Sequence, residues 1–277
     1  MGFDLLHFYL AKKPKISLNS LLEKLFTNRH NLKTISMFAK YSLVILFFSY
    51  ILGNSVSFAK INILAIGDSL TKGYYAQGES YAPYTDTMNE IFDSSPMQID
   101  IVNRGVDSLP IEIIHCNLEY AYEQDDYDLT IFLGGTNDLG YGFQEEEIIN
   151  NLGVSYANIL NSGSFLVGMT IPDLETINPQ VDPKRASVNQ WIRDYFKRAD
   201  PKQALLFDLQ DLVKNDWDKE LFWDHDNVHF SPAGYAKIGE ELVETFKASS
   251  ILDSIEFKKT QIPIRSRILN FLCRFKN

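Results

Sequence analysis

The chain has 277 residues, of which 45% are hydrophobic and 22% are charged, and this composition is typical of a globular protein with a hydrophobic core. The formal net charge is −10, but residues 60–257 contain 13 Lys or Arg and 34 Asp or Glu, and so carry a net charge of −21. A region this acidic repels polyanions, which argues against nucleic-acid binding through it.

The first sixty residues have the pattern of an export signal. The apolar run YSLVILFFSYIL spans 41–52, which is shorter than the roughly 20 residues of a membrane span but suits the core of a signal peptide. Lys40 precedes this run, and the segment SFA at 57–59 offers small residues to a signal peptidase. We therefore expect translation to start at Met37 and cleavage to follow Ala59. An uncleaved anchor and a buried helix are the alternatives.

The sequence predicts that the chain is divided into three parts. Residues 1–59 are predicted to be an N-terminal extension with a signal peptide, residues 60–250 the globular domain, and residues 251–277 a basic C-terminal tail. Residues 258–277 contain six Lys or Arg and no acid, and apolar residues from 264 onward fall at helical spacing. Such a segment suits weak peripheral contact with an anionic membrane. A helix that docks on the acidic body and a frayed tail are the alternatives.

From residue 61 onward, short apolar runs alternate with longer segments of mixed polarity. Continuous apolar runs of this length are typical of strands that are buried on both faces. The predicted strands are 61–66, 98–102, 128–133, 164–171 and 204–209. The predicted helices lie near 81–93, 109–123, 144–161, 184–198 and 232–247. This alternation predicts one α/β domain, a three-layer α/β/α sandwich with a central parallel sheet of about five strands.

Polar loops follow these strands. The first strand ends in GDSL at 67–70, the second in NRGVDS at 103–108 and the third in GGTND at 134–138, and WDHDNVH at 223–229 precedes the last helix. The carboxyl ends of parallel strands meet at one edge of a sheet, so these loops are expected to converge. Gly-Asp-Ser also suits a simple turn or helix cap, but the convergence favours Ser69 as a nucleophile.

These loops resemble the sequence blocks of the SGNH, or GDSL-type, hydrolases. GDSL at 67–70, GTND at 135–138 and DNVH at 226–229 occur in the family's order, and the resemblance covers 61–247. The GxSxG motif of ordinary α/β-hydrolases is absent, which disfavours that fold. The resemblance implies the flavodoxin-like SGNH fold and hydrolysis of carboxylic esters or thioesters.

The resemblance also implies catalytic roles. Ser69 would be the nucleophile, His229 the base that takes its proton, and Asp226 the group that orients the histidine. These residue types fit, because a hydroxyl is a poor nucleophile at neutral pH until a positioned base removes its proton. His225 is the rival base, but only His229 has the DxxH spacing. A metal site at Asp224–Asp226 and His229 is a further alternative. It is disfavoured because it would assign no function to the serine and asparagine loops.

An oxyanion hole is implied by the same resemblance. Its donors would be the backbone N–H of Ser69, the side-chain amide of Asn137 and a third N–H. The family usually has a glycine five residues after the Asn of its second block, whereas this chain has Ser108 after Asn103. A backbone donor requires glycine only where φ is positive, so Ser108 can serve, and Gly105 is the alternative.

Together these patterns predict a secreted or periplasmic serine esterase or lipase that acts on a small-molecule ester or lipid through an acyl-enzyme. An O-acyltransferase or carbohydrate deacetylase with the same site, and a non-catalytic carbohydrate- or lipid-binding module, are the alternatives. The oligomeric state is left open. Tyrosines at 74, 75, 81 and 84 either line an acyl or sugar pocket or pack the first helix.

No cofactor or metal is expected. A phosphate-cradling glycine-rich loop is absent. Cys116 and Cys273 lack the spacing of a disulfide framework or a zinc site, and we expect Cys116 to be a small buried residue.

Overall fold

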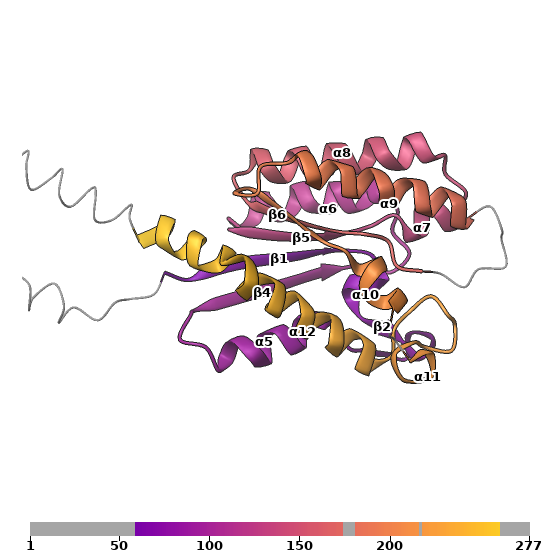
Figure 1. Ribbon diagram of the computed structural model, residues 1–277, viewed down its shortest axis with the longest axis horizontal. Helices are drawn as coiled ribbons and strands as arrows, with labels where there is room; N and C mark the ends of the chain where they lie inside the picture. The colour runs from indigo at the N-terminus through magenta and orange to yellow at the C-terminus, as the bar shows by residue number, and fades with distance from the viewer. Residues whose placement is uncertain (1–58, 174–180, 216–217, 261–277) are drawn as a thin grey trace, which may run out of the picture. The chain divides into compact units, whose positions relative to one another are not determined.

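The computed structural model describes residues 59–173, 181–215 and 218–260. A five-stranded sheet in the order β4-β1-β5-β6-β7 lies at its centre, with every neighbouring pair parallel and helices on both faces (Figure 1). The strands are β1 (Ile61–Gly67), β4 (Ile99–Gly105), β5 (Leu129–Leu133), β6 (Phe165–Met169) and β7 (Ala204–Phe207). The predicted α/β/α fold is confirmed, and each strand lies at an apolar run that predicts it.

β1 illustrates why continuous apolar runs form these strands. Successive side chains of a strand point to opposite faces of the sheet. Ile63 and Ala65 pack into the cluster on one face, and Leu64 and Ile66 into the cluster on the other. All four are 0% exposed, so this part of the strand needs apolar residues at successive positions.

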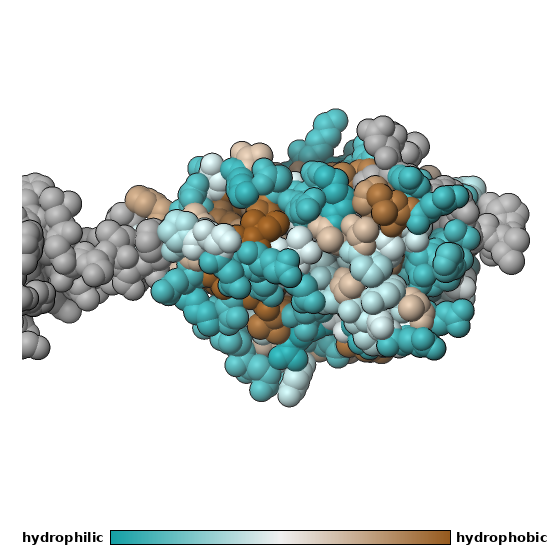
Figure 2. Space-filling model, turned by 90° about the horizontal axis from the view of Figure 1, so that it is seen from below, coloured by the Kyte–Doolittle hydropathy of each residue, from teal (hydrophilic) through white to brown (hydrophobic). Residues whose placement is uncertain are grey.

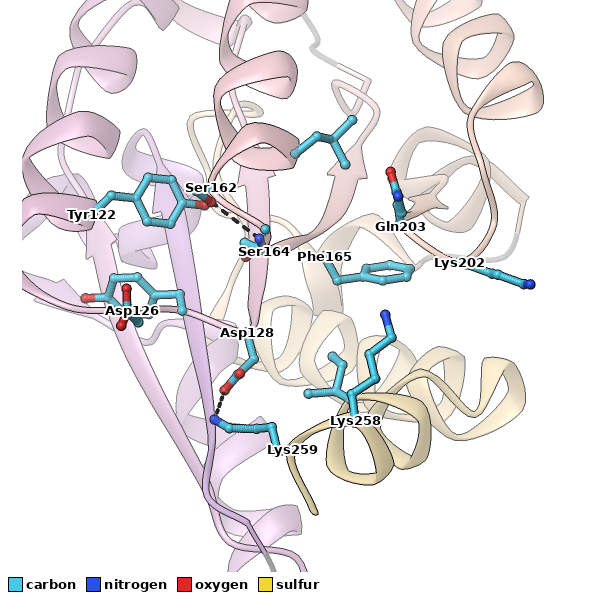
Figure 3. Close-up of a pocket in the computed structure, with 14 residues that line it drawn as sticks. Tyr122, Asp126, Asp128, Ser162, Ser164, Phe165, Lys202, Gln203, Lys258 and Lys259 are labelled. Carbon is cyan, nitrogen blue, oxygen red and sulfur yellow. Dashed lines mark hydrogen bonds and ion pairs between the residues drawn. The ribbon is translucent and has the colours of Figure 1, made fainter. Parts of the chain in front are cut away.

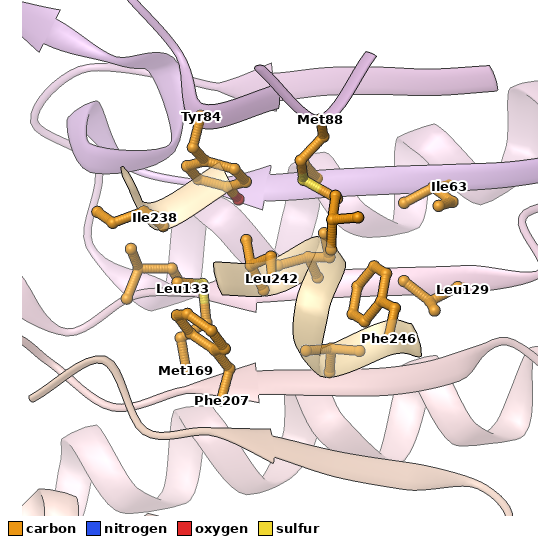
Figure 4. Packing of buried hydrophobic residues seen from close by; sticks show 14 of the residues in the cluster. Ile63, Tyr84, Met88, Leu129, Leu133, Met169, Phe207, Ile238, Leu242 and Phe246 are labelled. Atoms are coloured by element: carbon orange, nitrogen blue, oxygen red, sulfur yellow. The ribbon is translucent and has the colours of Figure 1, made fainter. Parts of the chain in front are cut away.

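Helices α5 (Tyr84–Asp93) and α12 (Pro232–Ser249) cover one face of the sheet. α12 starts at the predicted cap, where the Ser231 side chain accepts the N–H of Gly234. Figure 4 shows Leu242 and Phe246 of α12 over the strands, near Met88 of α5. The outer surface on this side is mainly hydrophilic, with hydrophobic residues in separate patches (Figure 2).

Helices α6 (Ile111–Gln124), α8 (Glu145–Asn161) and α9 (Val181–Arg198) cover the other face. On α6, Ile114 and Leu118 are buried against the sheet. Cys116 is exposed, so the prediction that it is buried is wrong. It lies two residues from both Ile114 and Leu118, and at 3.6 residues per turn this spacing turns its side chain away from the sheet.

Short elements gather at the carboxyl edge of the sheet. They are α4 (Ser69–Lys72), β2 (Tyr74–Tyr75), η1 (Ala76–Gly78), β3 (Ser80–Tyr81), α7 (Thr136–Gly140), α10 (Leu209–Asn215) and α11 (Lys219–Phe222). β2 and β3 pair antiparallel, and we call residues 74–81 the tyrosine hairpin. The sequence predicts no strands here.

The last described helix extends the hydrophobic core beyond residue 250. Residues 251–260 are helical, and Ile251, Leu252 and Ile255 are buried in the cluster under α5 and α12. The packed body therefore continues past the boundary that the sequence predicts for the domain.

Both ends of the described body lie at the amino edge of the sheet. The Lys259 ammonium donates to the Lys60 carbonyl and to the Asp128 carboxylate, each at 2.6 Å, and Asp128 immediately precedes β5. The predicted signal peptide, apart from its last residue, and the tail from 261 onward lie outside the described residues. None of the helices in the described ranges combines the length and hydropathy needed to span a bilayer.

Candidate active site

Ser69 lies directly after β1, in the first turn of α4. Asp68 caps this turn, and its Oδ1 accepts the N–H of Leu70 at 3.0 Å. Gly67 permits the tight exit from the strand, because a Cβ at this position would lie 2.4 Å from the carbonyl oxygen of Leu133. These contacts place Ser69 at the carboxyl edge of the sheet, where it is 6% exposed.

A chain of hydrogen bonds joins Ser69, His229 and Asp226. Ser69 Oγ lies 2.7 Å from His229 Nε2, and His229 Nδ1 lies 2.7 Å from Asp226 Oδ2. When the Nδ1 proton is directed at the carboxylate, Nε2 is left to accept the proton of the Ser69 hydroxyl. The structure thus brings these predicted residues together from loops that are far apart in sequence.

The loop at 223–230 fixes this arrangement. An antiparallel bridge joins its two ends, and the N–H of Asp224 donates to the carbonyl of His229 at 2.9 Å. Asp226 Oδ1 accepts the N–H groups of Val228 and His229, each at 2.9 Å. Burial acts to raise the pKa of Asp226, but these N–H groups and the His229 ring hold it below its ordinary value. Asp226 is therefore ionised at neutral pH.

The loop after β4 distinguishes the two candidate backbone donors. The N–H of Gly105 already donates to Asn103 Oδ1 at 2.9 Å. Ser108 has φ 63, which is the left-handed region that usually favours glycine. Among the described residues, the N–H groups of Ser108 and Ser69 have no acceptor. The geometry favours Ser108 over Gly105 as the third donor.

Asn137 lies in α7, just after β5. Its Nδ2 donates one hydrogen to the carbonyl of Leu109 at 3.2 Å, which places the amide beside the Ser108 turn and leaves the second hydrogen available. Gly135 allows the backbone before α7 to pass close to Ile171. It has φ 113, and a Cβ there would lie 2.5 Å from Ile171 Cδ1.

A comparison with protein families decides the classification. The model of the GDSL-like Lipase/Acylhydrolase family matches residues 65–237, a range that includes Ser69, Ser108, Asn137, Asp226 and His229. The chain belongs to this family. No curated protein matches the chain.

Solved structures of GDSL-type and other esterases share its fold. A lipase/acylhydrolase from Enterococcus faecalis has 19% identity and a TM-score of 0.58, covering 68% of this chain and 96% of its own. A psychrotrophic esterase from Pseudoalteromonas sp. has 18% identity and a TM-score of 0.55, covering 68% and 97%. An acetylxylan esterase from Geobacillus stearothermophilus has 21% identity and a TM-score of 0.52, covering 66% and 93%.

Two buried carboxyl groups of this GDSL-like acylhydrolase support the site, and neither has a role that the sequence predicts. Both Asp138 oxygens accept the N–H of Ile111, at 3.1 and 3.2 Å, which ties α7 to the start of α6. Burial raises the pKa of Asp138 to about 6 and that of Asp68 to about 7, although backbone N–H groups act in the opposite direction. The sequence signal that could have identified these two residues is their position inside the GDSL and GTND motifs.

The tyrosines after the nucleophile have different positions. Tyr84 is buried in the core beneath α12. Tyr74 lies against the His229 ring, with 4.4 Å between ring centroids, and Tyr81 is 43% exposed at the rim. Sequence left both a pocket-lining and a packing role open, and the structure shows packing for Tyr84 and a contact with the histidine for Tyr74.

The carboxylates of Asp224 and Asp226 accept backbone N–H groups. The Asp224 carboxylate accepts the backbone N–H groups of Ala76 and His225, each at 2.8 Å. His225 itself is exposed. Within the ranges that the structure describes, no group of three or more His, Cys, Asp or Glu side chains is arranged to hold a metal ion.

A cavity of about 600 Å³ lies at the opposite edge of the sheet (Figure 3). Its wall includes Asp128, Ser164 and Gln203, which immediately precede β5, β6 and β7. Asp128 is paired with Lys259. Because Ser69 follows the carboxyl end of β1, the length of the parallel strands separates this cavity from the candidate site.

Proposed function

We propose that the chain is a serine ester hydrolase in which Ser69, His229 and Asp226 form the catalytic triad. The observation that carries the proposal is the unbroken hydrogen-bond chain, at 2.7 Å and 2.7 Å, from the Ser69 hydroxyl through His229 to Asp226. A nucleophile, a base and a group that orients the base within hydrogen-bond reach are the requirements of covalent acyl transfer.

In the first half of the reaction, Ser69 Oγ attacks the carbonyl carbon of the ester while its proton passes to His229 Nε2. The negative charge that develops on the carbonyl oxygen is stabilised by the N–H groups of Ser69 and Ser108 and by the Asn137 amide. The intermediate collapses, the bond to the alcohol breaks, and the alcohol leaves with the proton from Nε2. Ser69 is then esterified by the acyl group.

Water reverses these steps in the second half. His229 Nε2 takes a proton from water as its oxygen attacks the acyl carbon, and the same donors stabilise the second oxyanion. Collapse breaks the bond to Ser69 Oγ, which recovers its proton from Nε2, and the carboxylic acid leaves. Asp226 stabilises the imidazolium during both halves without itself taking the proton.

The substrate class that we propose is a carboxylic ester. The names of the structural relatives, which include an acylhydrolase and an acetylxylan esterase, support ester substrates with differing acyl and alcohol parts.

We also propose that the enzyme is exported, with cleavage after Ala59. The position of β1 supports this, since it is the first strand that the structure describes and it starts at Ile61, just after the proposed cleavage site. N-terminal sequencing of exported protein is expected to find Lys60 as the first residue, and an intact Met1 would contradict cleavage.

We also propose that the basic C-terminal segment makes weak contact with anionic membranes. Six Lys or Arg without an acid in 258–277 support it. Sedimentation with vesicles that contain phosphatidylglycerol should be lost when 261–277 are deleted, and unchanged sedimentation would remove this part of the proposal.

The catalytic proposal is tested by hydrolysis of nitrophenyl esters from acetate to palmitate. Ser69→Ala and His229→Ala are expected to lower kcat by about 10⁴-fold or more. The matched control is His225→Ala, which changes an exposed histidine in the same loop and is expected to keep the wild-type rate. Equal rates for wild type and Ser69→Ala on every ester would refute the proposal.

A further inference from the structure

The His229 ring has a third contact besides Ser69 and Asp226. The Tyr74 ring lies on it with a centroid distance of 4.4 Å and an interplanar angle of 38°. Tyr74 is the first residue of the tyrosine hairpin, which follows directly after the nucleophile helix α4. The hairpin therefore links the segment that carries Ser69 to the ring that would take its proton.

The hairpin backbone is held at its first and third residues by buried or partly buried partners. The hydroxyl of Tyr235, which is 0% exposed on α12, donates to the carbonyl of Tyr74 at 2.9 Å. The carboxylate of Asp224 accepts the N–H of Ala76 at 2.8 Å. Asp224 lies in the same loop as His229, so one bond ties that loop to the hairpin.

The backbone beside this bond is strained. Ala76 and Gln77 have φ 52 and 57, in the left-handed region where residues with a Cβ are uncommon. Strained residues of this kind persist where surrounding contacts hold them, and they cluster at functional sites. The Asp224 carboxylate provides such a contact at Ala76.

The third contact matters because the Asp226 side chain is partly open to solvent. It is 35% exposed, whereas His229 is 14% exposed. Water competes for and screens a partly exposed ion pair, so the bond to Asp226 alone restrains the ring weakly. A ring packed against one face of the imidazole limits rotation about its side-chain bonds.

We propose that Tyr74 and Asp224 are positioning residues for His229. Asp224 fixes the hairpin backbone at Ala76, the hairpin presents the Tyr74 ring to the face of His229, and the imidazole keeps Nε2 directed at Ser69. The kinetic consequence rests on the proposed function, whereas the structural consequence for the ring does not.

Four variants of the full-length chain separate the contacts. Tyr74→Leu removes the ring, and Tyr74→Phe keeps it. Asp224→Asn is nearly the same shape, but its single oxygen can accept only one of the two N–H groups that the carboxylate holds. His225→Ala is the matched control in the same loop. Each is compared with wild type by kcat and KM on a short nitrophenyl ester, by thermal unfolding, and by the NMR signal of the proton between His229 Nδ1 and Asp226.

We expect Tyr74→Leu and Asp224→Asn to lower kcat by about tenfold or more while KM stays within about twofold. In both variants the Nδ1 proton signal should broaden or vanish through exchange with water while the protein stays folded. Tyr74→Phe and His225→Ala should keep the wild-type rate and signal.

Unchanged kcat and an unchanged signal in Tyr74→Leu and Asp224→Asn would overturn the inference, and so would an equal loss in Tyr74→Phe and Tyr74→Leu. If wild type and Ser69→Ala hydrolyse no ester, the proposed function fails. The proton signal in the same variants then still decides whether Tyr74 and Asp224 position the ring.

Discussion

Tyr141 donates its hydroxyl to the carbonyl oxygen of Ser108 at 2.8 Å. Ser108 has φ 63, and this contact holds its peptide unit beside Asn137. The chain thus has a serine in a backbone conformation that usually favours glycine.

This arrangement predicts that Ser108→Gly keeps activity. Glycine adopts the same positive φ without strain, and the proposed donor is the backbone N–H, so kcat should stay within about twofold of wild type. Steady-state hydrolysis of a nitrophenyl ester measures kcat for the variant and the wild type. A loss of tenfold or more would indicate instead that the Ser108 hydroxyl takes part.

Asn137→Ala is predicted to lower kcat by about 10²–10³-fold, because it removes one oxyanion donor. KM and the melting temperature should change little, since the amide makes a single bond, to Leu109. Asn158→Ala on α8, which removes an amide that donates to Glu119 of α6, is the control and should keep full activity. Equal rates for both variants would exclude Asn137 from the oxyanion hole.

The raised pKa of Asp68 predicts a loss of stability with rising pH. Its carboxyl is fully buried and titrates at about 7 when folded, against 3.8 for the ordinary group. Below pH 3.8 it is protonated in both states, and its contribution to stability is fully present. As pH rises from about 4 to 7 only the unfolded state ionises, so the unfolding free energy falls, by a few kcal/mol in total.

Asp68→Asn should remove this part of the pH dependence. The asparagine oxygen can still accept the Leu70 N–H, so the variant should gain stability over wild type at pH 8 and little at pH 4. Urea unfolding at several pH values measures the difference. Parallel curves for the two proteins would show that Asp68 is ionised in the folded state at pH 4 and above.

Gly105→Ala is predicted to destabilise the protein and lower activity. A Cβ on Gly105 would lie 2.2 Å from the backbone nitrogen of Lys72, at the end of α4. The helix that begins with Ser69 would have to move, and overpacking of this kind costs about 1–3 kcal/mol. Thermal unfolding and kcat report the two effects.

Gly140→Ala is the matched control for that change. A Cβ there meets nothing within 4 Å, and alanine is the better helix former by about 1 kcal/mol. It should keep activity and unfold at an equal or higher temperature. A comparable loss of stability in both variants would contradict the steric explanation.

The fold was predictable because its signals are local. The buried strands β1, β5 and β6 are mainly apolar runs, and α12 starts at a Ser-Pro cap. The tyrosine hairpin escaped prediction because its strands have two residues each, too few to show a period. The apolar neighbours of Cys116 in the sequence favour burial, but its exposure is decided by the side of α6 on which it lies, which faces away from the sheet.

The candidate site was predictable in its residue types but not in its contacts. The motifs indicate Ser69, Asn137, Asp226 and His229, which the structure brings to one edge. The bond from Asp224 to Ala76 joins residues 148 positions apart, and the ring contact between Tyr74 and His229 depends on how two loops pack. Neither leaves a pattern in a single sequence, because both depend on tertiary structure.

The bonds from Lys259 to Lys60 and Asp128 have a practical consequence. They bring the two ends of the described body together at the amino edge of the sheet, whereas Ser69 and His229 lie at the carboxyl edge. A resin, a solid support or a fused partner attached through residue 60 or residue 260 would begin on the side remote from the serine. Either end therefore offers a handle for immobilising the protein with the reacting edge left open to bulky esters.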